Sequence, residues 1–184
     1  MTIKTDKSQL QYATLAGGCF WCIESAFSRV KGIYSAISGY TGGHINNPTY
    51  EDICTGQSGH AEVVQLAFNA DEITYQEILE IFFTLHNPTQ LNRQGNDIGS
   101  QYRSAIFYHD DNQQHIAHQQ IQEIESENIF EQAIVTQVCP IDIFYTGEEY
   151  HQNYFDKNPQ NQYCQVIVSP KLTKFKQTFV NKLK

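Results

Sequence analysis

The chain has 184 residues, which is enough for one well-buried domain and too few for two ordinary ones. Hydrophobic residues make up 40% of it, as in globular proteins, and no apolar run approaches the ~20 residues that a membrane helix needs. A formal charge of −8 argues against nucleic acid as a general partner.

The cysteines indicate a reducing compartment. There are five, at positions 19, 22, 54, 139 and 164, an odd number without the spacing of a disulfide framework. Free or catalytic thiols fit this pattern. The N-terminal segment is polar and contains no apolar signal sequence, so we expect a cytoplasmic protein.

We expect residues 1–11 to be a flexible polar N-terminus and residues 12–184 to form one catalytic domain. The patterns predict strands over residues 12–16, 33–40, 61–68, 101–109 and 133–138, and helices over residues 22–27, 73–86 and 110–124 and from 170 onward. Strands mixed with helices that cross between them predict an α/β (α+β) fold. We expect a single-domain two-layer sandwich of ferredoxin-like type, with a mixed sheet covered by helices, long functional loops and a C-terminal helix. The patterns do not give the strand order.

Two polar loops are too long to be simple connectors. One has nearly twenty residues and ends at Gly59, and the other spans Thr89–Ser100. Loops of this length in compact domains are usually functional. Nearer the C-terminus, residues 148–157 predict a short helical turn, and Asn158–Gln162 predicts a flexible segment that leads to Cys164.

The turn between the first strand and the first helix carries Cys19. Gly17 and Gly18 mark a tight turn in which the backbone comes close to its surroundings. Cys19 is then expected at the helix N-terminus, where unpaired N–H groups and the helix dipole lower the pKa of a thiol. Cys19 is therefore either a reactive thiol of low pKa or a buried structural thiol.

Glu62 begins an otherwise apolar row. Residues 61–68 alternate strictly, so that Val64, Leu66 and Phe68 share a face with Glu62. The carboxyl group either lies in water at the rim of the sheet or is partly desolvated. Desolvation would raise its pKa and make it a proton donor near neutral pH.

Several site chemistries compete for these residues. Cys19 and Cys22 form a C-x-x-C pattern, typical of dithiol–disulfide exchangers, although bulky residues separate them and the long loops would then have no role. A zinc site made of these two cysteines with Cys139 and Cys164 would lack a second close-spaced pair. A hydrolase would need a histidine base, and spacing selects none of the seven histidines.

Attack of Cys19 on the sulfur of a sulfoxide uses more of these features at once. The methyl group on that sulfur needs an apolar cradle, for which Phe20 and Trp21 are suited. Tyr50 and Tyr102, in a loop and at a strand start, are suited to hold the oxygen through their hydroxyl groups.

Removal of the oxygen needs an acid and a second thiol. A desolvated Glu62 would supply the proton. A sulfenic acid left on Cys19 could be resolved as a disulfide by a mobile second cysteine, and Cys164 follows the flexible segment.

Six segments follow one another in a characteristic order: Gly18–Trp21, Gly39–Gly43, Asn47–Tyr50, Gly59–Val64, Arg93–Ser104 and Tyr150–Gln152. Together they resemble the peptide methionine sulfoxide reductases of type A. The resemblance implies the α/β fold of that family and reduction of the S epimer of methionine sulfoxide, free or in proteins, as a repair of oxidative damage. The R epimer would be left untouched, since each epimer has its own enzyme.

The resemblance also implies a role for each matching position. The implied roles are nucleophile for Cys19, methyl pocket for Phe20 and Trp21, proton donor for Glu62, hydroxyl donors to the sulfoxide oxygen for Tyr50 and Tyr102, substrate-orienting group for Asp97, and resolving cysteine for Cys164. Thioredoxin would reduce the resulting disulfide. No metal or organic cofactor is implied, and we expect a monomer.

The chain departs from the family pattern around its cysteines. Many members have glycine at the position of Cys22, so a route through a Cys19–Cys22 disulfide is also open. Many members follow the position of Cys164 with a glycine-rich tail and another cysteine, which this chain lacks. We interpret Cys54 and Cys139 as structural thiols.

Overall fold

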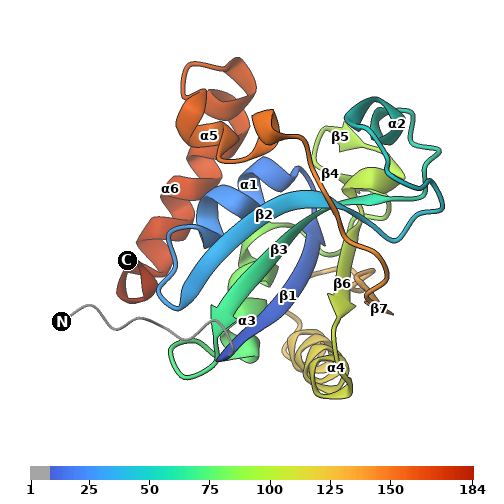
Figure 1. The fold of residues 1–184 in the computed structure, drawn as a ribbon. Helices are drawn as coiled ribbons and strands as arrows, with labels where there is room; N and C mark the ends of the chain where they lie inside the picture. Colours follow the sequence, from blue (N-terminus) through green and yellow to red (C-terminus); the bar gives the residue numbers. More distant parts are fainter. Residues whose placement is uncertain (1–8) are drawn as a thin grey trace.

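The structure is a computed structural model that describes residues 9–184 (Figure 1). Six strands form the main sheet: β1 (Leu10–Gly17), β2 (Ile33–Thr41), β3 (Ala61–Asn69), β6 (Ser104–Tyr108), β7 (Gln137–Pro140) and β8 (Tyr145–Thr146). A separate hairpin pairs β4 (Arg93–Gln94) with β5 (Asp97–Ile98). The helices are α1 (Phe20–Phe27), α2 (Tyr50–Cys54), α3 (Tyr75–Leu85), α4 (Asp111–Ser126), α5 (Tyr154–Lys157) and α6 (Ser169–Thr178). Shorter helical segments are η2 (Ser100–Tyr102), η3 (Glu149–His151), the π-helical η4 (Cys164–Val168) and η5 (Val180–Lys182).

The main sheet has the strand order β7-β6-β1-β3-β2-β8. Its four central strands are antiparallel, and with α1 and α3 they follow the order strand, helix, strand, strand, helix, strand of a ferredoxin-like unit. Parallel pairing of β7 with β6 makes the sheet mixed. The predicted α+β sandwich with a mixed sheet is confirmed, and the structure supplies the strand order.

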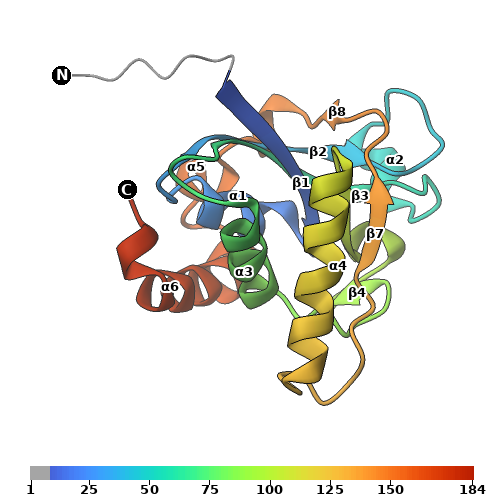
Figure 2. The same ribbon diagram turned by 90° about the horizontal axis from the view of Figure 1, so that it is seen from below.

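Helices cover one face of this sheet. Figure 2 shows α1, α3 and α6 on the same side of the strands, with α4 beside α3. The main hydrophobic core lies between them and the sheet, and its largest fully buried side chains include Phe27, Phe68, Phe82 and Phe175. Burial of a side chain of this size contributes about 1.5–3 kcal/mol. Of residues 9–184, no helix combines the length and apolar character needed to cross a membrane.

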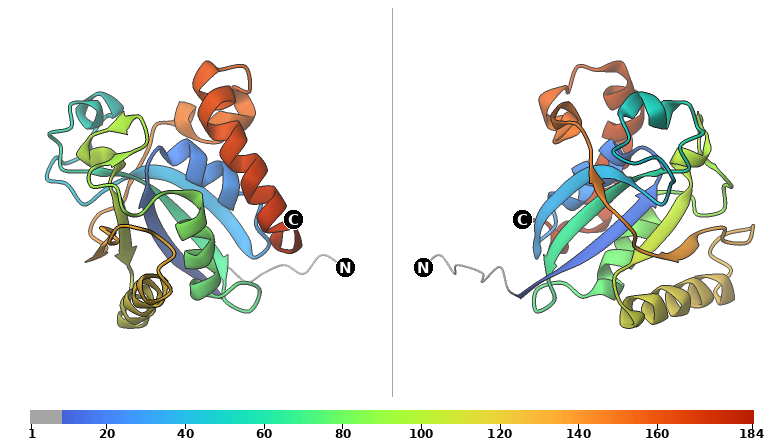
Figure 3. Two further views of the ribbon diagram at one scale, coloured as in Figure 1. Left: turned by 180° about the vertical axis from the view of Figure 1, so that it is seen from behind. Right: turned by 45° about the vertical axis from the view of Figure 1, so that its right-hand side comes forward.

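The opposite face of the sheet is covered by coil. The segment between β7 and β8 runs across that face (Figure 3), and Ile141 and Phe144 pack there against Ala61, Val63 and Phe107. This cluster is much smaller than the main core, so most of the buried apolar side chains lie on the helical side of the sheet. Along β3, Val64, Leu66 and Phe68 accordingly face the helical side, and Ala61 and Val63 face the coil.

Four strand ends meet at one end of the sheet. Because the central strands are antiparallel, the C-terminal ends of β1 and β2 lie beside the N-terminal ends of β3 and β6. Gly17 pairs with Ser104, and Thr41 pairs with Ala61. The turn at Cys19, the loop that contains α2, the start of β3 and the turn η2 are therefore brought together although they are far apart in sequence.

Some predicted boundaries are wrong. Leu10 and Gln11, assigned to the flexible N-terminus, belong to β1 and pair with Asn69 and Phe68, while residues 1–8 lie outside the described residues. The strand predicted over 101–109 begins only at Ser104, because residues 100–102 form the turn η2. The strand predicted over 133–138 is β7, shifted toward the C-terminus.

Other differences arise where elements are very short. The long loop before Gly59 contains α2, which begins with a capping box between Thr49 and Asp52. The strands β4, β5 and β8 have two residues each, too few for any periodic pattern. The helix predicted from residue 170 onward ends at Thr178, and Val180 beyond it is 62% exposed.

Candidate active site

The turn that carries Cys19 is held by close contact with the β4 hairpin. Gly18 has a φ of 89°, and a Cβ placed on it would lie 2.7 Å from the side chain of Gln94. A residue with a side chain would therefore be strained and would also clash. Cys19 is the N-cap residue of α1, as predicted, and its carbonyl accepts a hydrogen bond from the backbone N–H of Cys22.

The prediction of a low thiol pKa at Cys19 is wrong for the free protein. Burial raises the pKa of Cys19 well above its usual value, and the neighbouring Cys22 and Glu62 raise it further. The side chains of Cys19 and Cys22 are hydrogen-bonded, and this bond from Cys19 lowers the pKa of Cys22. Cys19 does lie at a helix N-terminus, which lowers the pKa of a thiol, but desolvation and the neighbouring acidic groups raise the pKa by more.

Glu62 lies at the start of β3, inside the protein. It is only 3% exposed, and its Oε2 accepts a hydrogen bond of 3.0 Å from the backbone N–H of Phe20. Burial raises the pKa of Glu62 to about 8, since the ionised form would lose its hydration. Of the two environments considered for this carboxyl, the structure has the desolvated one, so Glu62 carries a proton at neutral pH.

These groups surround one cavity of about 270 Å³. It is lined by Cys19, Phe20, Trp21, Tyr50, Glu62, Asp97, Tyr102, Asn161 and Tyr163. The structure thus brings together seven of the residues selected from the sequence. Of the selected residues, Cys22 and Cys164 do not line it.

The aromatic part of the cavity is built around Trp21. Its ring stacks on Tyr154 at 3.7 Å and 5°, and meets the Tyr163 ring edge-on. Its indole N–H donates a hydrogen bond of 3.1 Å to Nδ1 of His151. Phe20 lies beside His151 on the inner side, with ring centroids 4.9 Å apart. Trp21 is thus held in one orientation by the stacked ring of Tyr154, the edge-on ring of Tyr163 and the hydrogen bond at its polar edge.

Tyr50 and Tyr102 provide hydroxyl groups near the thiol and the carboxyl. The backbone N–H of Tyr50, the first residue of α2, donates to Oε1 of Glu148. Burial raises the pKa of both phenols, and in each case the charge of Glu62 contributes. Both tyrosines therefore stay protonated at neutral pH and can donate hydrogen bonds to an oxygen in the cavity.

Asp97 is paired with a second residue of the cavity. Its Oδ2 accepts a hydrogen bond from the hydroxyl group of Tyr163, which also lines the cavity. Asn161 lines the cavity as well, and its side-chain oxygen accepts hydrogen bonds from the backbone N–H groups of Tyr163 and Cys164. Tyr163 and Asn161 had no assigned role in the sequence analysis.

His151 is a further residue that sequence reasoning missed. It is buried, it contacts the rings of Phe20, Trp21 and Tyr50, and its Nε2 lies 3.3 Å from Glu148 Oε2. Burial lowers the pKa of His151, so the ring is neutral at pH 7 and Nδ1 can accept the bond from Trp21. The Tyr150–Gln152 motif was the available signal, but no spacing connected it to Trp21.

The second cysteines lie deeper than the cavity. Cys164 was expected at the end of a flexible segment, but it begins the π-helical segment η4 and its side chain is fully buried. Burial raises the pKa of Cys164, and the charge of Cys22 adds to this effect. Cys22 therefore interacts with both other cysteines: it is hydrogen-bonded to Cys19, and its charge affects the pKa of Cys164.

The remaining cysteines rule out the four-thiolate zinc site. Cys139 belongs to the small cluster on the coil-covered face of the sheet, whereas Cys19, Cys22 and Cys164 belong to the main core. Within residues 9–184, no three histidine, cysteine or acidic side chains gather as a metal site. Cys54, interpreted as structural, is exposed, and its thiol is hydrogen-bonded to the hydroxyl group of Tyr50.

Comparison with known proteins points to one family. A family model described as peptide methionine sulfoxide reductase matches residues 11–183. The peptide methionine sulfoxide reductase MsrA of Saccharolobus solfataricus is 51% identical over 175 residues, covering 95% of this chain and 98% of the relative. Mxr1 from Saccharomyces cerevisiae in reduced form has a TM-score of 0.79 and 36% identity, with 89% of this chain and 93% of that chain covered. The same protein in complex with Trx2 has a TM-score of 0.55 and 28% identity, with 83% and 90% covered. On this match of sequence, fold and length, the chain belongs to the peptide methionine sulfoxide reductase family.

Proposed function

We propose that this chain reduces the S epimer of methionine sulfoxide, free or in proteins, to methionine, and so repairs oxidised proteins. The observation that carries the proposal is a cavity in which a thiol, a protonated carboxyl group and two phenol hydroxyl groups converge beside a fixed indole ring. Each is a group that oxygen transfer from a sulfoxide to a thiol requires.

In the first step the substrate sulfoxide binds with its methyl group against Phe20 and Trp21 and its oxygen toward Tyr50 and Tyr102. Glu62 gives its proton to this oxygen, which makes the substrate sulfur electrophilic enough for attack by the sulfur of Cys19. The proton of the Cys19 thiol replaces the one that Glu62 has lost. This attack forms a bond between the two sulfurs. The bond breaks as the oxygen passes from the substrate sulfur to Cys19, which leaves a sulfenic acid on Cys19 and releases methionine as a thioether, so that one sulfur is oxidised and the other reduced.

Asp97 acts in this step through Tyr163. The hydrogen bond between them holds the phenol ring at an angle to Trp21, and we assign to this pair the orientation of the rest of the substrate. A negative charge on Asp97 also contributes to the raised pKa of Glu62, after the larger effect of burial.

The sulfenic acid is resolved in two thiol exchanges. Cys22 is hydrogen-bonded to Cys19, so its thiol displaces water and forms a Cys19–Cys22 disulfide. Cys164 then attacks Cys22, which frees Cys19 and leaves a Cys22–Cys164 disulfide. Cys164 keeps the resolving role implied by the family resemblance, and Cys22 connects it to the nucleophile.

Thioredoxin, a dithiol protein, reduces the final disulfide. Support comes from the solved complex of the relative Mxr1 with Trx2. Such a cycle requires a reducing compartment, and the five free cysteines suit the cytoplasm. We expect the protein to act as a monomer, and the proposed steps involve only protein groups and the external dithiol.

A coupled assay with separate S and R epimers of methionine sulfoxide tests the proposal. With thioredoxin or dithiothreitol as reductant, we expect turnover of the S epimer and none of the R epimer. A general disulfide exchanger, favoured by the hydrogen-bonded C-x-x-C thiols, would reduce insulin disulfides and ignore both sulfoxides. Reduction of insulin disulfides without turnover of either sulfoxide would disprove the proposed function.

A further inference from the structure

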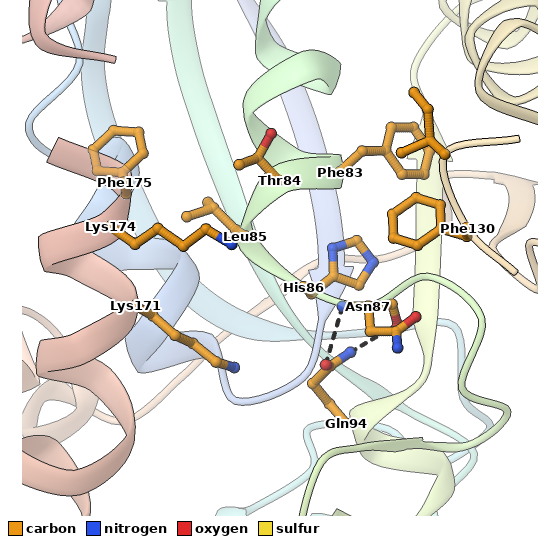
Figure 4. Close-up of a pocket in the computed structure, with 11 residues that line it drawn as sticks. Phe83, Thr84, Leu85, His86, Asn87, Gln94, Phe130, Lys171, Lys174 and Phe175 are labelled. Carbon is orange, nitrogen blue, oxygen red and sulfur yellow. Dashed lines mark hydrogen bonds between the residues drawn. The ribbon is translucent and has the colours of Figure 1, made fainter. Parts of the chain in front are cut away.

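A groove of about 470 Å³ lies between α6 and the C-terminal end of α3 (Figure 4). No residue is shared between its lining and that of the cavity around Cys19. Its volume falls in the range of small-molecule sites in proteins, about 300–1,000 Å³. The proposed reduction of sulfoxides leaves this groove without a role.

Two lysines from α6 give the groove its charge. Lys171 and Lys174 are one helical turn apart and therefore lie on the same side of α6, and Figure 4 shows both side chains extending toward the end of α3. Neither takes part in an ion pair or a side-chain hydrogen bond within the part of the chain that the structure describes, whereas Lys182 pairs with Glu77. Two neighbouring ammonium groups repel each other, and an anion between them would remove that repulsion.

The rest of the lining is mostly apolar. Phe175 and Phe83 lie on either side of the last turn of α3 and are almost fully buried, at 1% and 5% exposure, so that Phe130 is the partly exposed aromatic side chain of the lining (Figure 4). The one buried amide, Gln94, uses its side chain in hydrogen bonds with the backbone of Asn87 and offers little to a polar ligand. A neutral polar molecule would therefore gain little here, while an apolar body would gain contact with Ile129 and Phe130, the apolar lining residues that reach solvent.

We propose that this groove binds a small organic anion with an aromatic or branched apolar body, such as an aryl or acyl carboxylate. The anionic group lies between Lys171 and Lys174, and the body lies along the apolar lining toward Ile129 and Phe130. The binding does not depend on the proposed function, but its effect on catalysis does.

Two residues that line the groove also contact the segment that carries Cys19. His86 and Gln94 line the groove and also pack against Gly17 and Gly18, the two residues before Cys19. The hydrogen bond from Cys19 lowers the pKa of Cys22, and the positive charge of Lys171 adds to this lowering. An anion on Lys171 would oppose the second effect, so a bound ligand should slow the step in which Cys22 acts as a thiolate.

Binding can be measured with 8-anilinonaphthalene-1-sulfonate, an aryl sulfonate whose fluorescence rises in apolar surroundings. We expect saturable binding of one dye by the full reduced chain near neutral pH. The double variant Lys171→Gln/Lys174→Gln should weaken binding about tenfold, as expected for the loss of charge-assisted hydrogen bonds at partly exposed positions. Lys176→Gln is the matched control, because Lys176 is an exposed lysine of the same helix that does not line the groove.

Several results would overturn the site. They are an absence of saturable binding, equal affinity in the double lysine variant, or equal affinity for the neutral analogue N-phenyl-1-naphthylamine, which would mean adventitious apolar contact only. Circular dichroism of each variant excludes a loss of fold. The effect on the redox centre is measured by alkylation of Cys22 with iodoacetamide and peptide mass spectrometry, which needs no sulfoxide turnover. The dye should slow this alkylation in the wild-type chain and not in the double variant, and an unchanged rate with the dye bound would overturn the coupling.

Discussion

Cys19 is the residue on which the proposed chemistry depends most directly. Its sulfur is the one thiol that lines the cavity beside Glu62, and replacement by serine leaves a hydroxyl that cannot accept the oxygen as a sulfenic acid. We expect Cys19→Ser to lower turnover of the S epimer at least ~10³-fold, as for other nucleophiles. Cys139→Ser is the control, because Cys139 lies on the other face of the sheet and its variant should keep near-normal activity. Comparable rates for the two variants in a coupled assay would exclude Cys19 as nucleophile.

The ionisation of Glu62 should determine how the reaction rate depends on pH. Its pKa of about 8 means that the proton needed for the sulfoxide oxygen is present at neutral pH and is lost as the pH rises through 8. The single-turnover rate of sulfoxide reduction should therefore fall above this pH. Glu62→Gln should lower the rate about 10²-fold or more and should also remove the alkaline fall that comes from Glu62. A variant that keeps the wild-type rate and pH profile would reduce Glu62 to a structural residue.

At the scale of elements, α1 and η4 determine how the sulfenic acid is resolved. Cys22 is next to Cys19 on the first turn of α1, while Cys164 is buried at the start of η4. After one turnover without reductant, we expect peptide mass spectrometry to find a Cys22–Cys164 disulfide in the wild-type chain. Cys164→Ser should stop at a Cys19–Cys22 disulfide, and Cys22→Ser should accumulate the sulfenic acid, trapped with dimedone. A direct Cys19–Cys164 link formed equally fast in Cys22→Ser would remove Cys22 from the route.

A second element-scale prediction concerns α5, which supports Trp21. Glu24 of α1 is 2% exposed, and its Oε1 accepts a hydrogen bond from the backbone N–H of Asn153, just before α5. Asn153 has a φ of 53°, and this turn delivers Tyr154 to the face of Trp21. We expect Glu24→Ala to free α5, to raise KM several-fold with a smaller change in kcat, and to shift the fluorescence of Trp21, the chain's one tryptophan.

Glu24→Gln separates this positioning role from a role of the charge. The amide oxygen can still accept the bond from Asn153, so KM and fluorescence should return close to the wild-type values. If Gln behaved like Ala, the carboxyl proton rather than the hydrogen bond to α5 would be the important feature.

The sequence predicts the local part of the site well and the distant part poorly. Cys19 follows from a glycine turn before a helix, and Glu62 from strict alternation along a strand, because both depend on neighbours in the chain. The contacts of Trp21 with His151 and Tyr163 depend on the path of short helical turns and connecting loops more than a hundred residues away, which are too short to show periodicity. The family motifs contained His151 but could not say what it touches.

The thiol pKa illustrates a different limit. A cysteine at a helix N-terminus is ordinarily a more acidic thiol, and that argument is correct as far as α1 is concerned. Burial and the neighbours Cys22 and Glu62 reverse the direction for Cys19. Cys22 is a local neighbour, but Glu62 is brought to Cys19 by the fold, in which β3 pairs with β1. The sequence therefore predicts correctly that Cys19 lies at a helix N-terminus, but the rule that such a position lowers a thiol pKa gives the wrong direction for Cys19.

At the scale of the whole molecule, two buried carboxyl groups connect stability to pH. Burial raises the pKa of Glu62 to about 8 and that of Glu24 to about 7, against 4.5 for a free glutamate. Between pH 6.5 and 8 both groups are therefore ionised in the unfolded chain, while the folded chain still binds their protons. The free energy of unfolding must fall as the pH rises through this window, since the folded state then binds more protons than the unfolded state. His86 opposes this fall only at the lower edge of the window, because burial lowers its pKa to about 4 and the free residue titrates near 6.5.

Urea denaturation of the reduced protein at a series of pH values measures this effect. At 1.36 kcal/mol for each pKa unit, the loss of stability between pH 6.5 and 8 should be about 2 kcal/mol, most of it from Glu62. The double variant Glu24→Gln/Glu62→Gln keeps neutral side chains of the same shape, so its stability should be nearly constant over the window and should exceed that of the wild-type chain at pH 8. A wild-type stability that rises over this window would show that the two carboxyl groups are ionised in the folded protein, and Glu62 would then have no proton to give to the sulfoxide oxygen.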